Sequence, residues 1–410
     1  MKYGLIGERL GHSFSKKIHE RLGYEYELRE IEPKDIDAFM KERDFLGINV
    51  TMPYKATVIP YLDWIDDRAR AIGAVNTIVN RDGRLYGYNT DFNGMIALIN
   101  RAGIDIKGKK VAILGTGGTS KTAEAVLNYL GAGQIIKVSR SEKDKAISYE
   151  ELYASCSDTE IIINTTPVGM YPNIWDCPID ITKFDNLSGV VDAVYNPINT
   201  TLVQSARAIG IKAEGGLYML TAQAVEASQI FFDKHYPNEM QENIYREIKG
   251  EEENTVLIGM PSSGKSTIGR IVADKLGKKF VDTDELIEEK TGMKIRDFFT
   301  KHGEAEFRRI ESRVINSLSS ESGIVIATGG GAVLNESNVR SLKYNGKVYF
   351  IDRPLSDLMP TSDRPLSKDI ASLKKLYKER YSIYCNSCDE IIKADGDAET
   401  VAKKILEFYK

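Results

Sequence analysis

Short apolar runs recur along the chain, and three of them end in glycine turns that lead into helical patterns. These three runs lie at residues 2–6, 110–114 and 255–258. A buried strand, a glycine turn and a helix in that order are typical of α/β units with parallel sheets. Further apolar runs predict buried strands at residues 135–138, 161–164, 190–192, 324–327 and 347–351, and a further strand is expected to end within residues 280–284. The pattern therefore predicts an α/β fold.

A chain of 410 residues exceeds the size of one ordinary core, so we expect two or three domains. The best boundary candidate is the charged stretch IYREIKGEEEN at residues 244–254, which offers almost nothing apolar to bury. We interpret residues 249–254 as a linker because a strand pattern restarts at Thr255. The alternative is a solvated helix face that continues into the next domain.

The composition is that of a globular protein, with 42% apolar and 28% charged residues. A net charge of −4 provides no field that attracts nucleic acid or an acidic membrane, so we expect neither partner. The sequence shows no signal-peptide pattern and no apolar run as long as a membrane span, so we expect a cytoplasmic protein. Four cysteines are too few for a disulfide scaffold. A metal or redox site at Cys385 and Cys388 is an alternative that lacks a second pair nearby.

The third glycine turn matches the Walker A pattern. Its sequence, GMPSSGKS at residues 259–266, follows a strand and precedes a helix pattern. Glycines let the backbone N–H groups surround phosphates, while Lys265 reaches the outer phosphates and Ser266 is placed to ligate Mg²⁺. The turn therefore predicts a site for ATP and Mg²⁺, with a chance glycine-rich turn as the alternative.

Five further motifs follow this loop. They are FVDTD at 280–284, GEAEFRRIE at 303–311, TGGG at 328–331, DRPL at 363–366 and YKERYSIY at 377–384. In this order they resemble shikimate kinase across the C-terminal segment. The resemblance implies a P-loop, nucleoside-monophosphate-kinase-like α/β/α domain of five strands over residues 255–410.

The same resemblance implies roles for single residues. ATP would contact Gly259, Ser262, Ser263, Gly264, Lys265, Ser266, Thr267 and Arg364. Of these, Lys265 and the lid residue Arg364 would act catalytically on the transferring phosphate. Mg²⁺ would be held by Ser266 and, through water, by Asp282. Shikimate would be held by Asp284, Arg308, Gly330 and Arg380, which are residue types that bind hydroxyls and carboxylates.

Two features depart from the family pattern. Ser262 stands where the family usually has glycine, and the segment 353–380 is shorter than usual, which predicts a trimmed lid. We expect both departures to affect the catalytic rate and not the class of ligand. Taken alone, Asp284 could also be the N-cap of the helix pattern that follows it.

The first 248 residues contain a second ordered set of motifs. They are GHSFS at 11–15, GINVTMPYK at 47–55, GAVNT at 73–77, GYNTD at 87–91, GTGG at 115–118, NTTPVGM at 164–170, DAVYNP at 192–197 and GLYMLTAQ at 216–223. This set resembles shikimate dehydrogenase. The resemblance implies a substrate domain over residues 1–100, a Rossmann-type NADP domain over residues 101–216, and a return to the first domain over residues 217–248.

Lys55 and Asp91 would meet across a cleft as a pair that manages one proton. Reduction of a ketone by hydride transfer leaves an alkoxide, which a lysine oriented by a carboxylate can protonate. The resemblance assigns this catalytic role to both residues, whereas an isolated pair would be read as a surface ion pair. It also implies substrate contacts by Ser13, Ser15, Thr51, Asn76, Asn89, Tyr195 and Gln223. Turn or cap chemistry is the alternative for Asn89 and Tyr195, and Lys16 stands where the family commonly has proline.

The turn at residues 115–118 follows a strand and opens a helix pattern, as a dinucleotide loop does. The resemblance implies NADP contacts at Gly115, Gly117, Gly118 and Gly216. The next strand ends in Ser139-Arg140-Ser141, where an NAD site usually has an acidic residue. Arg140 and Ser139 suit a 2′-phosphate, so we expect NADP. A solvent-exposed strand end is the alternative.

The two resemblances imply successive reactions. The first half would reduce 3-dehydroshikimate with NADPH to shikimate. The second would transfer the γ-phosphoryl group of ATP to the 3-hydroxyl, giving shikimate 3-phosphate on the way to chorismate and aromatic amino acids. Alternatives are a quinate enzyme that uses NAD, which Arg140 disfavours, and a non-catalytic sensor that regulates transcription, for which no basic DNA-reading segment is visible. Small molecules are the expected partners, and the oligomeric state is left open.

Overall fold

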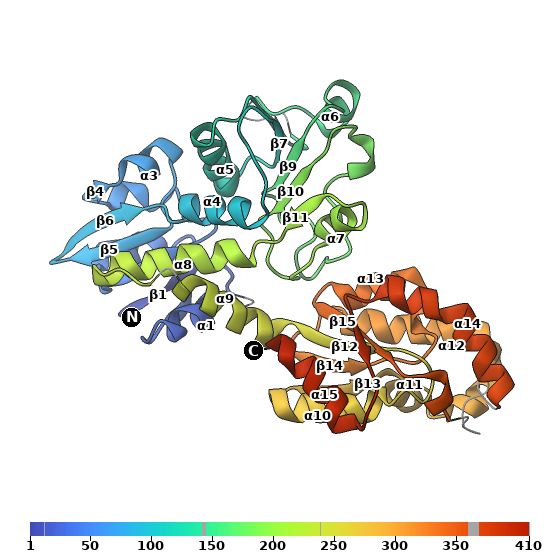
Figure 1. The fold of residues 1–410 in the computed structure, drawn as a ribbon. Coiled ribbons are helices and arrows are strands. Elements are labelled where there is room, and N and C mark those ends of the chain that lie inside the picture. The colour runs from blue at the N-terminus through green and yellow to red at the C-terminus, as the bar shows by residue number, and fades with distance from the viewer. Residues whose placement is uncertain (12, 142–144, 238, 360–368, 410) are drawn as a thin grey trace. The chain divides into compact units, whose positions relative to one another are not determined.

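The computed structural model describes residues 1–11, 13–141, 145–237, 239–359 and 369–409. The chain divides into two compact units, Met1–Ile248 and Lys249–Lys410, whose elements are labelled in Figure 1. Each unit has its own sheets and its own buried clusters. Within these ranges, no helix combines the length and the apolarity needed to cross a bilayer.

The first sheet of the N-terminal unit has six strands in the order β2-β1-β3-β5-β6-β4. β1 runs parallel to β2 and β3, so the loops after β1 and β3 leave the sheet at the same edge. Bonds from Glu8 N to Met52 O and from Thr51 N to Ile6 O join these two loops. The strands and helices of this part are β1 (Tyr3–Gly7), α1 (Ser15–Arg21), β2 (Glu27–Glu30), α2 (Ile36–Glu42), β3 (Gly47–Val50), β4 (Trp64–Ile65), α3 (Asp67–Ile72), β5 (Thr77–Arg81), β6 (Arg84–Tyr88) and α4 (Asp91–Arg101).

β5 and β6 form an antiparallel hairpin that the apolar pattern does not predict. Its turn residues Asp82 and Gly83 have φ values of +53° and +82°. Positive φ at both central positions is the geometry of a type I′ turn, which the Asp-Gly pair favours because it matches the twist of the strands. The Asp-Gly pair is therefore the sequence signal for this hairpin.

The second sheet of the same unit has five parallel strands in the order β11-β10-β9-β7-β8. Counted from β7, this is the doubly wound order 2-1-3-4-5, whose switch point lies between β7 and β9. Ligands bind such sheets beyond the carboxyl ends of the strands at that point. The predicted Rossmann-type class is confirmed. Its elements are β7 (Lys110–Leu114), α5 (Gly118–Tyr129), β8 (Gln134–Val138), α6 (Tyr149–Ser155), β9 (Ile161–Asn164), β10 (Gly189–Asp192), α7 (Thr201–Ala208) and β11 (Lys212–Glu214).

After β11 the chain returns to the first sheet through α8 (Leu217–Phe232), which α9 (Glu239–Glu252) follows. Phe231 of α8 packs directly on Gly47 of β3, where a Cβ would come within 2.5 Å of the Phe231 ring. Phe231 also shares a buried cluster with Leu5 of β1 and Val79 of β5. The apolar face of the first sheet is thus covered by a helix that comes late in the sequence.

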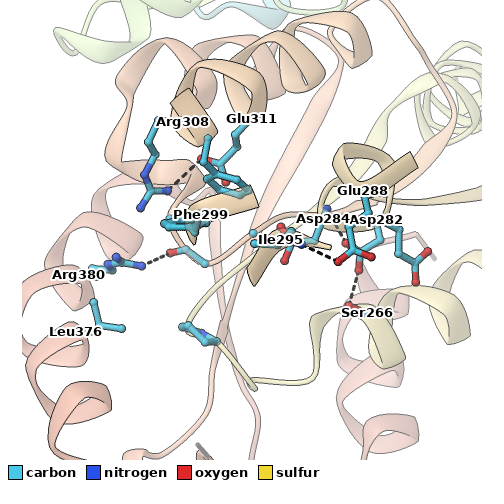
Figure 2. Close-up of a pocket in the computed structure, with 16 residues that line it drawn as sticks. Ser266, Asp282, Asp284, Glu288, Ile295, Phe299, Arg308, Glu311, Leu376 and Arg380 are labelled. Carbon is cyan, nitrogen blue, oxygen red and sulfur yellow. Dashed lines mark hydrogen bonds and ion pairs between the residues drawn. The ribbon is translucent and has the colours of Figure 1, made fainter. Parts of the chain in front are cut away.

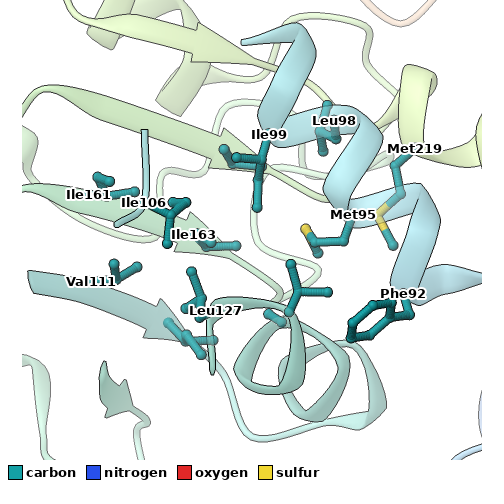
Figure 3. Close-up of a cluster of buried hydrophobic side chains, with 14 of the residues drawn as sticks. Phe92, Met95, Leu98, Ile99, Ile106, Val111, Leu127, Ile161, Ile163 and Met219 are labelled. Atoms are coloured by element: carbon teal, nitrogen blue, oxygen red, sulfur yellow. The ribbon is translucent and has the colours of Figure 1, made fainter. Parts of the chain in front are cut away.

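One buried core of the N-terminal unit packs α4 and α8 against the second sheet. Phe92 and Met95 of α4 are buried with residues of β7, β9 and α5, and Met219 of α8 joins them (Figure 3). α4 and α8 approach closely at Gly94, where a Cβ would lie 2.9 Å from Met219 O. This packing fixes Asp91, at the start of α4, relative to the glycine turn after β7.

The C-terminal unit has one sheet of five parallel strands in the order β13-β14-β12-β15-β16. Val256 and Ile258 of β12 face a cluster with α12, α13 and α14, whereas Leu257 faces a cluster with α10 and α15. Helices thus cover both faces, and the predicted α/β/α class is confirmed. The elements are β12 (Asn254–Ile258), α10 (Lys265–Leu276), β13 (Lys279–Asp282), α11 (Thr283–Thr291), α12 (Ile295–Leu318), β14 (Ile324–Ala327), α13 (Glu336–Lys343), β15 (Gly346–Asp352), α14 (Ile370–Ser387), β16 (Glu390–Lys393) and α15 (Ala398–Leu406).

Residues 249–254, which we interpreted as a linker, form regular structure instead. α9 continues to Glu252 and β12 begins at Asn254, so the alternative of a continuing helix describes this stretch better. The Asn254 side chain is buried, donates to Glu321 O at 2.7 Å and accepts from Ile324 N at 2.9 Å. The stretch has few apolar residues, but the side chain of Asn254 forms hydrogen bonds within the C-terminal unit.

Candidate active sites

The first site centres on an ion pair between Lys55 and Asp91. Lys55 Nζ donates to Asp91 Oδ2 at 2.6 Å, and only 17% and 11% of these side chains are exposed. Lys55 lies in the loop after β3, where its carbonyl accepts from Val75 N at 2.8 Å, and Asp91 is the first residue of α4. The pair is therefore shielded from water, which strengthens its attraction and excludes the alternative of a surface ion pair.

Lys55 also lies beside the glycine turn after β7. A Cβ placed on Gly118 would lie 3.8 Å from Lys55 Cδ. Gly115 has a φ of +108°, and a Cβ there would come within 2.9 Å of Thr165 Oγ1 in the loop after β9. At Gly117 a Cβ would meet nothing within 4 Å. The turn is an open cradle at the switch point of the sheet, so it fits the phosphates of a dinucleotide such as NADP.

The residues predicted to select NADP lie at the end of β8. Arg140 is exposed, and Ser139 Oγ accepts from Ser141 N at 3.2 Å. An exposed guanidinium and a hydroxyl at this place fit a 2′-phosphate.

Gly216, also predicted to contact NADP, is explained by packing, because a Cβ there would collide with the carbonyl of Ala193. The close packing explains this glycine, and its contact with NADP stays a prediction.

Among the predicted substrate contacts, Ser13 contacts both Ser15 and Tyr195. Ser13 Oγ donates to Ser15 Oγ at 3.1 Å. Burial raises the pKa of the Tyr195 phenol, and a hydrogen bond with Ser13 opposes part of this increase. The Phe14 and Tyr195 rings lie 5.4 Å apart. The loop after β1 and the loop after β10 thus present three hydroxyls together, which suits a small polar acid.

The other predicted substrate contacts lie around Asp91. Asn76 donates to Thr90 Oγ1 at 3.0 Å and accepts from Thr90 N at 2.8 Å, so its amide is satisfied within the protein. Thr90 Oγ1 in turn contacts Gln223 Oε1 at 3.4 Å. Asn89 donates to Ala74 O at 2.9 Å, but its buried Oδ1 has no partner in the part of the chain that the structure describes. Since a buried acceptor without a partner is costly, Asn89 has the strongest case for binding a ligand hydroxyl. Thr51, the remaining candidate, begins the loop that carries Lys55.

Glu226 carries a half-buried carboxyl group near this site that the motifs do not reveal. It lies one turn after Gln223 on α8, and its Oε1 accepts from Asn93 Nδ2 at 2.6 Å. Its Oε2 is buried and has no hydrogen-bond partner among the described residues. Burial raises the pKa of Glu226 to about 7; Asn93 and Arg68 lower it, whereas Asp91 and Asp66 add to the increase.

Glu226 is expected to make the stability of the N-terminal unit depend on pH. Its pKa is raised in the folded state, so its contribution to stability is complete below the ordinary value of 4.5 and is lost as pH rises toward about 7. Glu226→Gln should therefore melt at a higher temperature than the wild-type chain above neutral pH, and this advantage should vanish in acid. Both tryptophans, Trp64 and Trp175, lie in the N-terminal unit, so tryptophan fluorescence follows its unfolding alone.

The control is Glu124→Gln, which removes a carboxylate that pairs with Lys137 and is 36% exposed. This change should leave the dependence of melting temperature on pH nearly unaltered, because the Glu124 carboxylate keeps contact with water and an ion pair of this kind contributes little to stability. Identical pH profiles for Glu226→Gln and the wild-type chain would contradict the role of burial at Glu226.

The second site is built around the loop between β12 and α10. Gly259 and Gly264 have φ values of +148° and +92°, and a Cβ on Gly259 would come within 2.8 Å of Ile351 O. Lys265 is 5% exposed and donates to the carbonyls of Gly259 and Met260 at 3.0 and 2.8 Å. The loop thus wraps its backbone around the buried Lys265 ammonium group, as a phosphate-binding loop does, so it fits the phosphates of ATP.

The groups predicted to hold Mg²⁺ lie together at this loop. Ser266 Oγ donates to Asp282 Oδ2 at 2.6 Å. No group of three or more His, Cys, Asp or Glu side chains that could hold a metal occurs in the described ranges. One hydroxyl and one carboxylate are nevertheless a usual protein share for Mg²⁺, which keeps waters and takes phosphate oxygens from its nucleotide.

Ser262, the departure from the family pattern, has a φ of +64°. An L-residue pays a steric penalty in this left-handed region that glycine escapes. We expect Ser262→Gly to raise the free energy of unfolding of the C-terminal unit by about 0.5–1 kcal/mol. Denaturant unfolding followed by far-UV circular dichroism reports both units, whereas tryptophan fluorescence reports the N-terminal unit alone. The transition seen only by circular dichroism therefore gives the free energy of unfolding of the C-terminal unit. The neighbouring change Ser263→Gly is the control, because Ser263 has no positive φ; a gain from both changes would contradict the strain at Ser262.

A cavity of about 320 Å³ opens beside the phosphate loop (Figure 2). Arg308 of α12 and Arg380 of α14 point into it, and Asp284 lies nearer the loop. Arg380 Nη1 donates to Gly330 O at 3.0 Å. A second cavity, lined by the loop itself, shares Ser266, Asp282 and Asp284 with the first. Two guanidinium groups and a carboxylate around a small cavity that joins a phosphate loop suit a hydroxylated carboxylic acid next to ATP.

Two details of this cavity go beyond the motifs. Asp282 and not Asp284 caps α11, because Asp284 N donates to Asp282 Oδ1 at 2.9 Å; the capping alternative for Asp284 is therefore excluded. Glu311 is 1% exposed and accepts from Arg308 Nη1 at 3.1 Å, and burial raises its pKa to about 7. The i, i+3 spacing of Arg308 and Glu311 is the sequence signal that could have identified this orienting partner.

Two further sequence expectations concern this unit, the lid residue Arg364 and the cysteine pair. Arg364, expected in the lid, lies outside the described residues. Cys388 Sγ donates to the Cys385 carbonyl at 3.4 Å, and burial raises the pKa of the Cys388 thiol. A raised pKa disfavours the thiolate that metal binding or redox chemistry needs, so nothing favours that alternative.

Comparison with known proteins gives consistent matches for both parts. The shikimate kinase family model matches residues 261–410, and the model of the shikimate dehydrogenase substrate binding domain matches residues 5–78. The NADP⁺-dependent shikimate dehydrogenase of Clostridium beijerinckii is 38% identical over 270 residues, which are 61% of this chain and 98% of that protein.

Solved structures give the same result for the first part. A shikimate dehydrogenase from Peptoclostridium difficile is 39% identical and covers 60% of this chain and 98% of its own, with a TM-score of 0.57. A shikimate 5-dehydrogenase from Thermus thermophilus, solved with NADP(H) and shikimate, is 28% identical and covers 60% and 99%, with a TM-score of 0.53.

Proposed function

Because the chain belongs to the shikimate dehydrogenase family and carries a shikimate kinase domain after it, we propose that one polypeptide catalyses two successive steps. The first reduces 3-dehydroshikimate with NADPH to shikimate, and the second phosphorylates shikimate with ATP at the 3-hydroxyl. One observation supports the proposal: in each unit the side chains proposed to be catalytic or substrate-binding lie beside a nucleotide loop, with Lys55 beside Gly118 and the Arg308–Arg380 cavity beside Ser266.

In the first step, bound NADPH supplies a hydride to the substrate ketone. Lys55 Nζ, held by Asp91, donates the proton that the forming alkoxide needs. The hydroxyls of Ser13, Ser15 and Tyr195 bind and orient the acid at one end of the site. The free Oδ1 of Asn89 accepts a hydrogen bond from a ring hydroxyl. We assign residues 1–100 and 217–248 to substrate binding and residues 101–216 to NADP.

In the second step, bound ATP supplies the phosphoryl group. Lys265 exchanges its hydrogen bonds to the Gly259 and Met260 carbonyls for contacts with the outer phosphates, whose charge it neutralises. Ser266 and Asp282 would hold Mg²⁺. Arg308 and Arg380 bind the carboxylate of shikimate. Asp284 accepts a hydrogen bond from a hydroxyl of shikimate and so orients the acceptor. Residues 255–410 form this kinase domain, and the cytoplasmic location stays a prediction.

The decisive experiment supplies the purified chain with 3-dehydroshikimate, NADPH and ATP–Mg²⁺. We expect shikimate 3-phosphate to form, and its formation to stop when NADPH is left out and resume when shikimate is added. Mass spectrometry of the products distinguishes the two steps. If shikimate accumulates without phosphorylation, the kinase assignment is wrong; if added shikimate is phosphorylated but NADPH is not consumed, the dehydrogenase assignment is wrong.

Arg140 should decide the choice between NADPH and NADH. Removing its charge takes away a donor for the 2′-phosphate, which NADH lacks, so Arg140→Ala should raise the KM for NADPH by roughly 10-fold and leave the KM for NADH unchanged. Initial rates with both cofactors measure the change. Lys107→Ala, at an exposed lysine of the same unit, is the control. An equal loss with both cofactors would show that Arg140 does not contact the 2′-phosphate.

A further inference from the structure

The acceptor cavity lies toward one edge of the C-terminal sheet. Its residues Asp284 and Gly330 follow β13 and β14, which both lie on one side of β12. The phosphate loop follows β12 itself, in the middle of the sheet. β15 and β16 lie on the other side of β12, and they contribute no strand end to either cavity in the described part of the chain.

This arrangement fixes the direction of the nucleotide. In phosphoryl transfer the attacking oxygen and the leaving oxygen lie roughly in line on opposite sides of the phosphorus. The acceptor attacks from the β13 and β14 side, so the ADP that leaves must extend toward β15. Parallel α/β sheets bind ligands beyond the carboxyl ends of their strands, which is where β15 ends.

Arg353 is the residue that directly follows β15. Its Nε donates to Ser263 O of the phosphate loop at 3.1 Å, and a Cβ on Gly264 would lie 3.7 Å from its Nη2. The guanidinium group is therefore held at the end of the loop, where α10 begins. Neither of its terminal nitrogens has a hydrogen-bond partner within the described ranges.

The neighbouring carboxylate does not neutralise this arginine. Asp352 is buried and accepts from Lys393 Nζ at 2.5 Å and from Tyr381 OH at 3.2 Å. Arg353 thus brings a positive charge and a planar fork of free donors to the side of the loop where the leaving nucleotide must lie. A fork of this kind matches phosphate oxygens.

We propose that Arg353 binds the phosphates of the ADP portion of ATP. This inference rests on the proposed kinase function and adds a cation to the site besides Lys265. Arg353 contacts the part of ATP that leaves, so it binds ATP and ADP alike and does not contact shikimate. The bond to Ser263 O holds the guanidinium group in place before the nucleotide arrives.

The test is a calorimetric titration of the full chain with ADP, and separately with inorganic pyrophosphate. Arg353→Ala should weaken the binding of both by roughly 10-fold, and Arg353→Lys by less, because a lysine keeps the charge but loses the fork. The KM for ATP should rise in step, while the KM for shikimate stays unchanged. Arg340→Ala, at an exposed arginine of α13, is the matched control and should bind ADP normally.

Three results would overturn the proposal. One is unchanged ADP binding together with a lower melting temperature, which would show that Arg353 only stabilises the phosphate loop through its bond to Ser263 O. Another is weaker binding of ADP with normal binding of pyrophosphate, which would place the contact at the ribose or base. The third is an Arg353→Gln variant, equal in melting temperature to the wild-type chain, that binds ADP normally. These titrations measure binding and need no phosphoryl transfer. If the kinase assignment itself is wrong, the wild-type chain will not phosphorylate shikimate, and that result is recognised separately.

Discussion

Lys55→Met is expected to consume NADPH in the presence of 3-dehydroshikimate about 10³-fold more slowly than the wild-type chain. In the proposed mechanism, Lys55 Nζ, which lies 2.6 Å from Asp91 Oδ2, donates the proton that the reduced ketone must receive, and methionine has a similar shape but no proton to give. The loss of NADPH absorbance measures the rate. The same sample should phosphorylate added shikimate at the normal rate, because the second site shares no residue with the first.

The control for this change is Lys137→Met, which breaks an ion pair with Glu124 on the same unit. It should leave the reduction unchanged. Unfolding followed by Trp64 and Trp175 fluorescence shows whether each variant is folded. A folded Lys55→Met variant with near-normal reduction would remove Lys55 from the mechanism.

Lys265→Met is expected to show the reverse pattern. Phosphorylation of shikimate should fall by about 10²–10³-fold, because the charge that develops on the phosphates loses its buried cation. The reduction of 3-dehydroshikimate should be unaffected. Formation of ADP, measured with shikimate as the only added acceptor, reports the loss.

Lys290→Met is the matched control, since Lys290 is an exposed lysine of the same unit that donates to Ser317 Oγ at 3.4 Å. It should phosphorylate shikimate normally. If Lys55→Met or Lys265→Met silenced both reactions in a folded chain, the assignment of two separate sites would be wrong.

Much of the fold could be predicted because its central strands are buried on both faces. The strands at 110–114, 161–164 and 324–327 read as continuous apolar runs, and the structure has them with the same bounds. Edge strands carry no such signal. The sequence of β2, ELRE, is mostly exposed, and β16 has three charged or exposed positions in four, so neither could be recognised from apolar content.

The site residues could be predicted where a short motif contains both the functional side chains and the glycines that the backbone conformation requires. The turns at Gly115 and Gly259 are examples, because positive φ demands glycine there. Glu226 could not be predicted, since its environment comes from Asn93, 133 residues earlier in the chain. The role of Arg353 could not be predicted for the same reason, because its partner Ser263 is 90 residues away and only the order of the strands in the sheet places the two together.

The late return of α8 has a consequence for synthesis on the ribosome. Leu5 and Gly47 are among the first residues translated, but Phe231, which covers them, is translated 226 positions after Leu5 and 184 positions after Gly47. Until then, the nascent chain exposes an uncovered apolar sheet, which is a substrate for chaperones and a site for aggregation. The C-terminal unit is one contiguous stretch, so its folding needs no such wait.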